Sequence, residues 1–171
     1  MKKLSAFTAL LVSLVLLWSC STTQAKTSAE NNGDNENVEE AITQQAKDDA
    51  AFGKVYNAYR NRLILSKASQ YEVKKGDTLA HIAWAFYPKE KYGEYGGFYF
   101  PLIMLASSDV VLDPDQIEPG MHLTIPDIQE NLDNPDSKAM LKAYLKDIAS
   151  IYHKRGRIQD EKGLIDLSNS L

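Results

Sequence analysis

The sequence predicts an α+β fold in which a small strand–helix–helix–strand unit is flanked by additional helices. Short β-prone runs at residues 70–73 and 121–125 are each bounded by turn residues. Between these two runs, and again on either side of them, apolar residues recur at the three- and four-residue steps of a helix. The predicted organisation is therefore one compact unit with helical extensions before and after it.

The first helix of the unit should follow a polar turn. Gly76 and Asp77 supply that turn and a helix N-cap, because an Asp side chain accepts hydrogen bonds from the free backbone N–H groups of a first helical turn. This predicts a helix that starts at Thr78 and ends before Pro88. Its apolar positions share one face and are Leu79, Ile82, Ala83 and Phe86.

The second helix is predicted over residues 100–107. Pro101 is tolerated in its first turn. The residues spaced to pack inward are Phe100, Ile103 and Ala106. A turn at Pro119 and Gly120 then leads into the final strand at residues 121–125, which Pro126 ends.

The two ends of this unit resemble the LysM family. The resemblance lies in the run YEVKKGDTL from Tyr71 to Leu79 and the run DPDQIEPGMHLTIP from Asp113 to Pro126. It covers residues 70–126, about a third of the chain, and implies a two-stranded antiparallel sheet packed by two helices. It also implies binding of glycans that contain N-acetylglucosamine, such as peptidoglycan and chitin.

The resemblance further implies a shallow glycan-binding groove between two loops. One loop joins the first strand to the first helix, and the other joins the second helix to the second strand. The implied groove residues are Gly76, Asp77, Thr78, Leu79, Asp113, Pro114, Asp115, Gln116 and Ile117. The alternative is that residues such as Gly76, Asp77, Pro114 and Gly120 only shape turns.

The chain departs from the family pattern in two places. LysM domains usually have Trp at the start of the second helix and Asn at its end, where this chain has Phe100 and Ser107. Ser tolerates a left-handed backbone less well than Asn, which puts the loop geometry there in question. Residues 89–99 form an insertion that its glycines should make flexible. Its aromatic residues are Tyr92, Tyr95, Phe98 and Tyr99. They either stack on sugar or fold back to cover the small core, and we favour the covering role.

The N-terminus predicts export and lipid attachment. Residues 1–19 combine a positive start with an apolar stretch too short for a stable membrane span, which is typical of a signal peptide. The run from Leu17 to Cys20 is similar to the bacterial lipobox. Cys20 is the only cysteine, so lipidation is its most economical role, and the alternative is a secreted protein with an odd thiol. Several acyl chains, palmitate among them, would hold the protein on the membrane.

Ser21 stands where enteric bacteria place Asp to retain lipoproteins at the inner membrane, so an outer-membrane, periplasm-facing envelope location is favoured. The polar composition of residues 20–37 predicts a disordered tether. The next segment, residues 38–69, predicts an N-terminal helix. The apolar positions of that helix are Val38, Ile42, Phe52, Val55, Tyr56, Tyr59 and Leu63.

Residues 127–171 predict a C-terminal helical hairpin. Asn134 and Pro135 suit its first helix N-terminus. The apolar stripe of that helix contains Leu141, Tyr144, Leu145, Ile148 and Tyr152, and a shorter helix over residues 159–167 presents Ile158, Leu164 and Leu167. We expect this hairpin to pack on the N-terminal helix. The alternative is a docking surface for a protein partner, as in an envelope scaffold lipoprotein.

No enzyme or metal protein is predicted, and no cofactor is implied. His81, His122 and His153 are scattered without the spacing of a metal site. Asp113 and Asp115 sit on one turn, whereas a glycosidase pair must face a bond across a cleft. The net charge of −4 becomes −6 without Lys2 and Lys3, which argues against nucleic-acid binding. A neutral amino sugar, read by hydrogen bonds, suits this surface.

Overall fold

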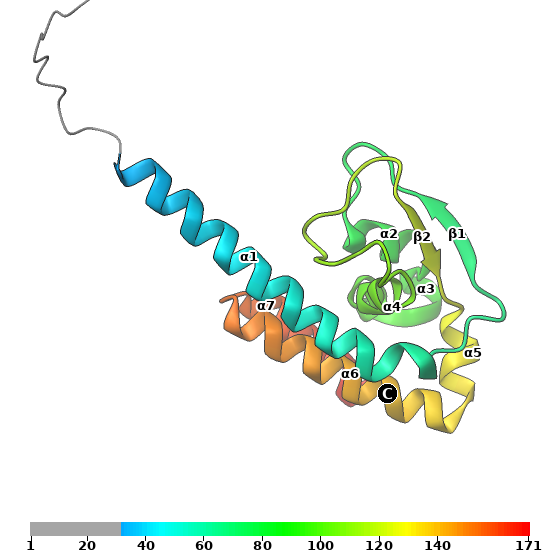
Figure 1. Cartoon of the computed structure of the whole chain (residues 1–171). Coiled ribbons are helices and arrows are strands. Elements are labelled where there is room, and N and C mark those ends of the chain that lie inside the picture. Colours follow the sequence, from blue (N-terminus) through cyan, green and yellow to red (C-terminus); the bar gives the residue numbers. More distant parts are fainter. Residues whose placement is uncertain (1–31) are drawn as a thin grey trace, which may run out of the picture.

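The computed structural model describes residues 32–171 (Figure 1). The predicted signal peptide, the lipidation site Cys20 and the first part of the predicted tether lie outside the described residues. The described part confirms the α+β fold, with one two-stranded sheet among helices. In chain order the elements are α1 Asn32–Tyr59, the 3₁₀ helix η1 Arg60–Arg62, β1 Ser69–Glu72, α2 Leu79–Phe86, α3 Lys89–Tyr92, the 3₁₀ helix η2 Gly93–Tyr99, α4 Phe100–Ala106, β2 His122–Ile125, α5 Ile128–Asp133, α6 Pro135–Lys154 and α7 Ile158–Ser170.

The sheet pairs β1 with β2 in antiparallel register, from Ser69 opposite Ile125 to Glu72 opposite His122. The pairing continues past the strands, because Val73 donates its N–H to the Met121 carbonyl at 2.9 Å and accepts from Gly120 N at 2.9 Å. Gly120 has φ of 92°, a left-handed backbone that favours glycine. The predicted strand–helix–helix–strand order is confirmed, and residues 69–125 are called the βααβ unit below.

Helix α2 begins one residue later than predicted, and its N-cap is Thr78 rather than Asp77. Thr78 Oγ1 accepts the N–H of His81 at 3.2 Å. The Asp77 carboxylate instead accepts from the backbone N–H of Lys74 and from the Tyr71 hydroxyl, both at 2.8 Å. These bonds hold the pKa of the Asp77 carboxyl below its usual value. Asp77 therefore braces the turn before the helix instead of capping the helix itself.

Ser107 resolves the question raised by the missing Asn at the end of the second helix. Its φ is −112°, so the backbone there is not left-handed and serine carries no penalty. The Ser107 hydroxyl accepts the N–H of Thr124 at 2.9 Å and so ties the end of α4 to β2. Phe100 and Ile103 pack inward as predicted, while Ala106 is half-buried.

The insertion between α2 and α4 is helical and covers the core, which confirms the favoured alternative. It forms α3 and η2, and the Tyr92 and Tyr99 rings lie within 6.1 Å of each other and 5.9 Å from the Tyr87 ring. Two of the glycines that were expected to make it flexible have a packing role instead. Gly96 and Gly97 are buried against Tyr87 and Trp84, where a side chain would collide, so they permit close packing.

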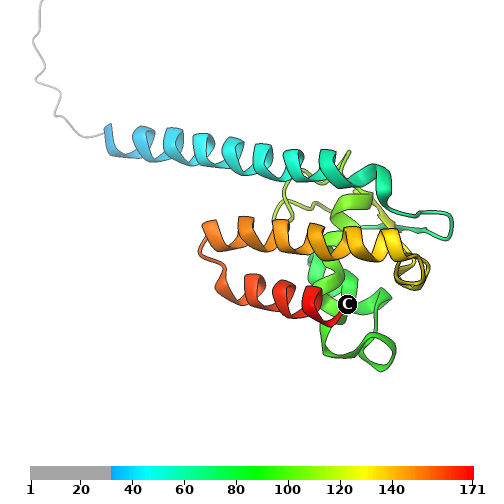
Figure 2. The same cartoon turned by 90° about the horizontal axis from the view of Figure 1, so that it is seen from below.

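Helices α1, α6 and α7 form a layer on one side of the βααβ unit, in which α6 runs antiparallel to both α1 and α7 (Figures 1 and 2). The predicted packing of the hairpin on α1 is confirmed by the contact of Phe52 with Tyr152 at 6.2 Å between ring centroids. Tyr59 likewise packs on Tyr144 at 5.6 Å and donates its hydroxyl to Asp147 at 2.7 Å. The apolar stripe predicted for α6 is buried throughout.

The N-terminal half of α1 extends past the end of the hairpin in both views (Figures 1 and 2). Val38 is 57% exposed and Ile42 is 65% exposed, so these two apolar positions of the predicted helix lie outside the core. Residues 32–37, predicted as tether, are helical, because adding turns to an existing helix avoids the cost of nucleation. Ile158, at the start of α7, is likewise 53% exposed.

The hairpin packs on the βααβ unit as well as on α1, so that all these elements share one hydrophobic core. Tyr144 donates its hydroxyl to the Pro101 carbonyl at 2.7 Å, and the Phe100 and Tyr152 rings meet edge to face at 5.9 Å. The Phe98 ring fills the space beside Gly163 on α7. Along residues 32–171, none of the helices combines the length and apolar character needed to cross a bilayer.

Candidate functional site

The two predicted groove loops lie together and border a small cavity that is open to solvent on one side. One loop joins β1 to α2, the other joins α4 to β2, and the cavity volume is about 210 Å³. The cavity is lined by Thr78, Leu79, Ala80, Phe100, Pro114, Asp115, Tyr152, Arg157 and Asp160. The predicted site residues that the structure brings together here are Thr78, Leu79, Pro114 and Asp115.

The other predicted site residues lie elsewhere on the same loops. Gln116 and Ile117 line a second hollow of about 480 Å³ beside the α4–β2 loop, together with Asp113 and Asp115. Gly76, with φ of 92°, gives the first turn its left-handed backbone. Asp77 points back to Lys74 and Tyr71, as described above. These two residues shape the first loop and line neither cavity.

Asp113 is a buried brace of the second loop, with 2% of its surface exposed. Its carboxylate accepts from Arg155 Nη2 at 2.5 Å and Nη1 at 3.2 Å, from Gln45 Nε2 at 3.0 Å and from the N–H of Asp115 at 2.9 Å. Burial alone would raise the pKa of Asp113, but these hydrogen bonds outweigh it and hold that pKa below its usual value. The side chain of Asp113 positions the loop and does not face the cavity.

Asp115 and Arg157 make the second connection between loop and hairpin. Arg157 Nη1 lies 2.6 Å from each Asp115 carboxylate oxygen, and its Nε donates to Asp160 at 2.7 Å. The guanidinium lies 4.9 Å from the centre of the Tyr152 ring. Burial would lower the pKa of Arg157, but Asp115 and Asp160 raise it above its usual value. Residues Asp113, Asp115, Arg155 and Arg157 are called the arginine clamp below.

The arginine clamp also reaches α1. Arg155 Nη2 lies 3.1 Å from the Asp48 carboxylate, and its guanidinium lies 4.7 Å from the centre of the Phe52 ring. Only 12% of the Arg155 side chain is exposed. The clamp thus fixes the α4–β2 loop against two helices from opposite ends of the chain.

Acid should release the arginine clamp. Because the folded-state pKa of Asp113 lies below its unfolded value of about 3.9, its contribution to stability is complete above about pH 4 and is lost as the pH falls through the lowered pKa. We expect the free energy of unfolding, measured by urea titration at a series of pH values, to fall below pH ~4. An Asp113→Asn variant should be less stable at neutral pH, and its free energy of unfolding should change less with pH below about pH 4. If the stability of both proteins depends on pH in the same way, Asp113 is not the group whose protonation weakens the fold.

Sequence reasoning missed the contribution of the hairpin to the cavity. Tyr152, Arg157 and Asp160 come from α6, α7 and the turn between them, outside the predicted domain. One signal was present in the sequence, since Arg155 and Arg157 repeat the two-residue spacing of Asp113 and Asp115. Oppositely charged pairs at matching spacing suggest a contact, but only once the two segments are known to be neighbours.

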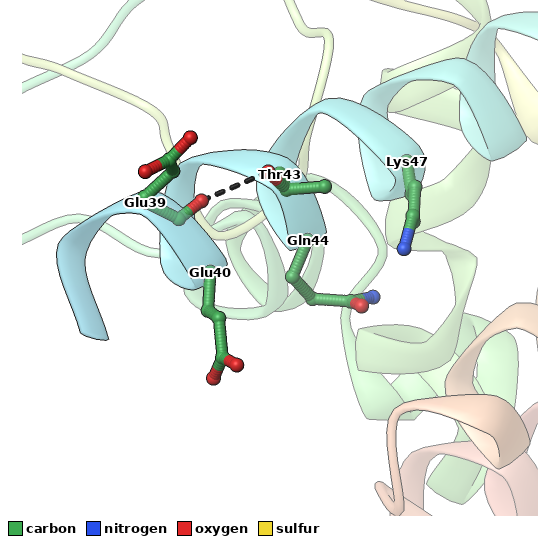
Figure 3. A pocket seen from close by; sticks show the side chains of 5 residues that line it. All are labelled: Glu39, Glu40, Thr43, Gln44 and Lys47. Carbon is green, nitrogen blue, oxygen red and sulfur yellow. Dashed lines mark hydrogen bonds between the residues drawn. The ribbon is translucent and has the colours of Figure 1, made fainter. Parts of the chain in front are cut away.

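Other hollows of the described structure lie away from the two loops, and one of about 200 Å³ beside the start of β1 and the end of β2 has Lys67, Tyr87 and Asp127 among its lining residues. Among residues 32–171 no cluster of three or more His, Cys, Asp or Glu side chains is placed to hold a metal ion. A hollow of about 450 Å³ runs along α1 (Figure 3) and is lined by Glu39, Glu40, Thr43, Gln44 and Lys47. All of these described lining residues belong to one helix. A single helical wall does not make polar groups converge on a ligand.

A comparison with protein-family models relates the sequence of this region to a known family. The model of the LysM domain matches residues 71–126. Comparisons with curated proteins and with solved structures gave no match. LysM domains are carbohydrate-binding modules for N-acetylglucosamine-containing glycans such as peptidoglycan. The match runs from within β1 to the residue after β2 and includes both loops around the 210 Å³ cavity. Residues 71–126 of this chain are therefore a LysM domain.

Proposed function

We propose that this protein binds peptidoglycan reversibly and without covalent chemistry, through the cavity between the two loops of its LysM domain. The observation that carries the proposal is that Thr78, Leu79, Pro114 and Asp115, from both loops, line one cavity. Apolar walls with a few convergent polar groups are typical of small-ligand sites. At about 210 Å³ the cavity is smaller than the usual 300–1,000 Å³ of drug-sized sites, which suits one sugar unit of a longer chain.

The arginine clamp supports a binding role rather than a catalytic one. Catalytic carboxylates of glycosidases face each other across the scissile bond, about 5 to 9.5 Å apart. Asp113 and Asp115 instead lie on the same loop, and each accepts hydrogen bonds from an arginine of the hairpin. Their carboxylates are engaged in holding the loop.

We further propose that the protein is anchored in the bacterial cell envelope by lipid on Cys20, after removal of residues 1–19. The support is the lipobox-like run that ends in the only cysteine of the chain. Ser21 favours the periplasmic side of the outer membrane. Attachment to the membrane on one side and to peptidoglycan on the other would raise the effective concentration of a weak sugar site.

Filling the cavity should abolish wall binding. Ala80 is exposed on the first turn of α2 and lines the cavity, so Ala80→Leu adds bulk there without removing a native contact. We expect the protein comprising residues 21–171, which retains every described residue, to pellet with insoluble peptidoglycan. The Ala80→Leu variant should bind at least about tenfold more weakly, since steric exclusion of the sugar removes well over 1.4 kcal/mol.

The matched control is Ala85→Leu, an exposed alanine of the same helix that does not line the cavity. This variant should pellet like the parent. If the parent stays in solution at moderate salt, peptidoglycan binding is contradicted. Equal pelleting of both variants and the parent would instead move the sugar site away from this cavity.

A second function remains open because of one observation on α1. Val38 and Ile42 are exposed on the half of the helix that extends past the hairpin. An envelope scaffold lipoprotein would use such a surface to hold a protein partner. Failure of wall binding in the parent would favour this alternative.

A further inference from the structure

We infer that the C-terminal hairpin forms part of the glycan site, with Arg157 and Asp160 in direct contact with the bound sugar. The inference rests on the proposed function and deepens it, because these residues lie outside the LysM domain. The site would then be composite and would be incomplete in the domain alone.

The cavity itself carries the first step of the argument. Its walls come from the β1–α2 loop and α2, from the α4–β2 loop, and from the hairpin. Side-chain exposure is 40% for Arg157, 50% for Asp115 and 29% for Asp160. A ligand that touches Thr78 and Pro114 inside a space of about 210 Å³ therefore meets the hairpin wall as well.

Unused hydrogen-bonding capacity on that wall is the second step. The hydrogen bonds that Arg157 makes within the described part of the chain engage Nε and Nη1, which leaves the N–H groups of Nη2 for a ligand. Asp160 accepts from Arg157 through Oδ2, which leaves Oδ1. Arg155 differs, because both of its Nη atoms bind carboxylates and its side chain is only 12% exposed.

The charge balance of the wall selects the class of ligand. Arg157 lies between the carboxylates of Asp115 and Asp160, so the group carries no net positive charge to attract an anion. A sugar hydroxyl can accept from the guanidinium and donate to a carboxylate at the same time, and both bonds are strengthened by the charged partner. The Tyr152 ring and Asp115 hold the guanidinium in place before binding, which lowers the entropy lost when the sugar binds. The wall suits the hydroxyls of an uncharged sugar ring, such as an N-acetylglucosamine unit within the glycan.

The test compares two conservative variants with a matched neighbour. The probe is a soluble tetrasaccharide of alternating N-acetylglucosamine and N-acetylmuramic acid, titrated into the protein comprising residues 21–171. Asp160→Asn and Arg157→Lys keep size and general polarity while removing a carboxylate acceptor or the planar fork. The control is Glu161→Gln, which alters the next carboxylate along α7, whose partner is the exposed His153.

We expect Asp160→Asn and Arg157→Lys, called the groove variants, each to bind about tenfold more weakly, because each loses one charge-assisted hydrogen bond. The control should bind like the parent. A direct readout is the side-chain Nε–H resonance of Arg157 in the ¹⁵N-labelled parent, which should shift on addition of the tetrasaccharide. If Arg157 had a purely structural role, its side-chain resonance would not shift on addition of the tetrasaccharide while the backbone resonances of α7 stay unchanged.

Each result has a defined meaning. If the parent binds and the Arg157 resonance stays in place, the inference is overturned and the proposed function stands, whatever the affinities of the variants. If the resonance shifts but both groove variants bind like the control, direct contact of these residues with the sugar is likewise overturned. If the parent does not bind the tetrasaccharide, the proposed function fails and the inference fails with it.

Discussion

Asp113→Ala is expected to lower the free energy of unfolding by about 3 kcal/mol at neutral pH. The reason is that the substitution leaves Arg155, only 12% exposed, without the buried carboxylate 2.5 Å from its Nη2 atom. An arginine cannot shed its proton, so its charge stays largely buried with less compensation. Asp48, at 3.1 Å, retains part of the pairing and keeps the loss near the lower end of the range for a broken buried pair.

Urea unfolding followed by circular dichroism measures this loss. The control is Asp109→Ala, which removes an exposed carboxylate from the same connection between α4 and β2. That change should stay within about 0.5 kcal/mol of the parent. If Asp113→Ala also falls within that margin, the loop does not depend on the clamp for its position.

Gly96→Ala is expected to destabilise the protein by a similar amount, about 3 kcal/mol, through overpacking. A Cβ at position 96 would lie 2.1 Å from the backbone carbonyl oxygen of Tyr87 and 3.0 Å from the Trp84 ring. The carbonyl cannot rotate away as a side chain can, so either the backbone of η2 or the end of α2 must shift. That shift would disturb the cluster of Tyr87, Tyr92 and Tyr99.

Gly53→Ala is the matched substitution, because a Cβ at position 53 meets nothing within 4 Å and lies inside α1. It should raise stability by about 0.5 to 1 kcal/mol, the helix preference of alanine over glycine. If Gly96 is needed for close packing rather than for flexibility, thermal or urea unfolding should show a loss of stability for Gly96→Ala and a gain for Gly53→Ala. A Gly96→Ala protein as stable as the parent would show that the insertion can shift to accommodate the added methyl group at little cost.

The βααβ unit was predictable because its boundaries are set by local chemistry. Gly76 and Gly120 mark turns that need a left-handed backbone, and Pro126 ends the second strand. The α6 N-terminus was predictable for the same reason, since Asn134 accepts from Ser137 N at 2.9 Å just before a proline. Such signals act over a few residues and need no knowledge of the rest of the fold.

The errors have in common that they depend on distant parts of the chain. Val38 and Ile42 fit the helical period of α1, yet whether they are buried depends on where the hairpin ends. The insertion was ordered by contacts such as that of Phe98 with Gly163, 65 residues apart. Helix α5 lies in a short stretch without a clear apolar period and was not predicted.

The site shows the same division. The two loops were located correctly, and Thr78, Leu79, Pro114 and Asp115 do line one cavity. The role of Asp113 was not predictable, because its burial follows from the position of Arg155, 42 residues away. A motif thus identifies the loops of a site, while the direction of each side chain depends on the packing around them.

The projecting half of α1 has a mechanical consequence. At 1.5 Å per residue the 28-residue helix is about 42 Å long, and its far half is packed into the body of the protein. A rigid helix fixes both the distance and the direction between its two ends, whereas a flexible coil limits only the distance. Removing one residue from the projecting half would turn the point of attachment by about 100° around the helix axis. The point at which the chain enters α1 at Asn32 is therefore fixed in distance and direction relative to the LysM domain.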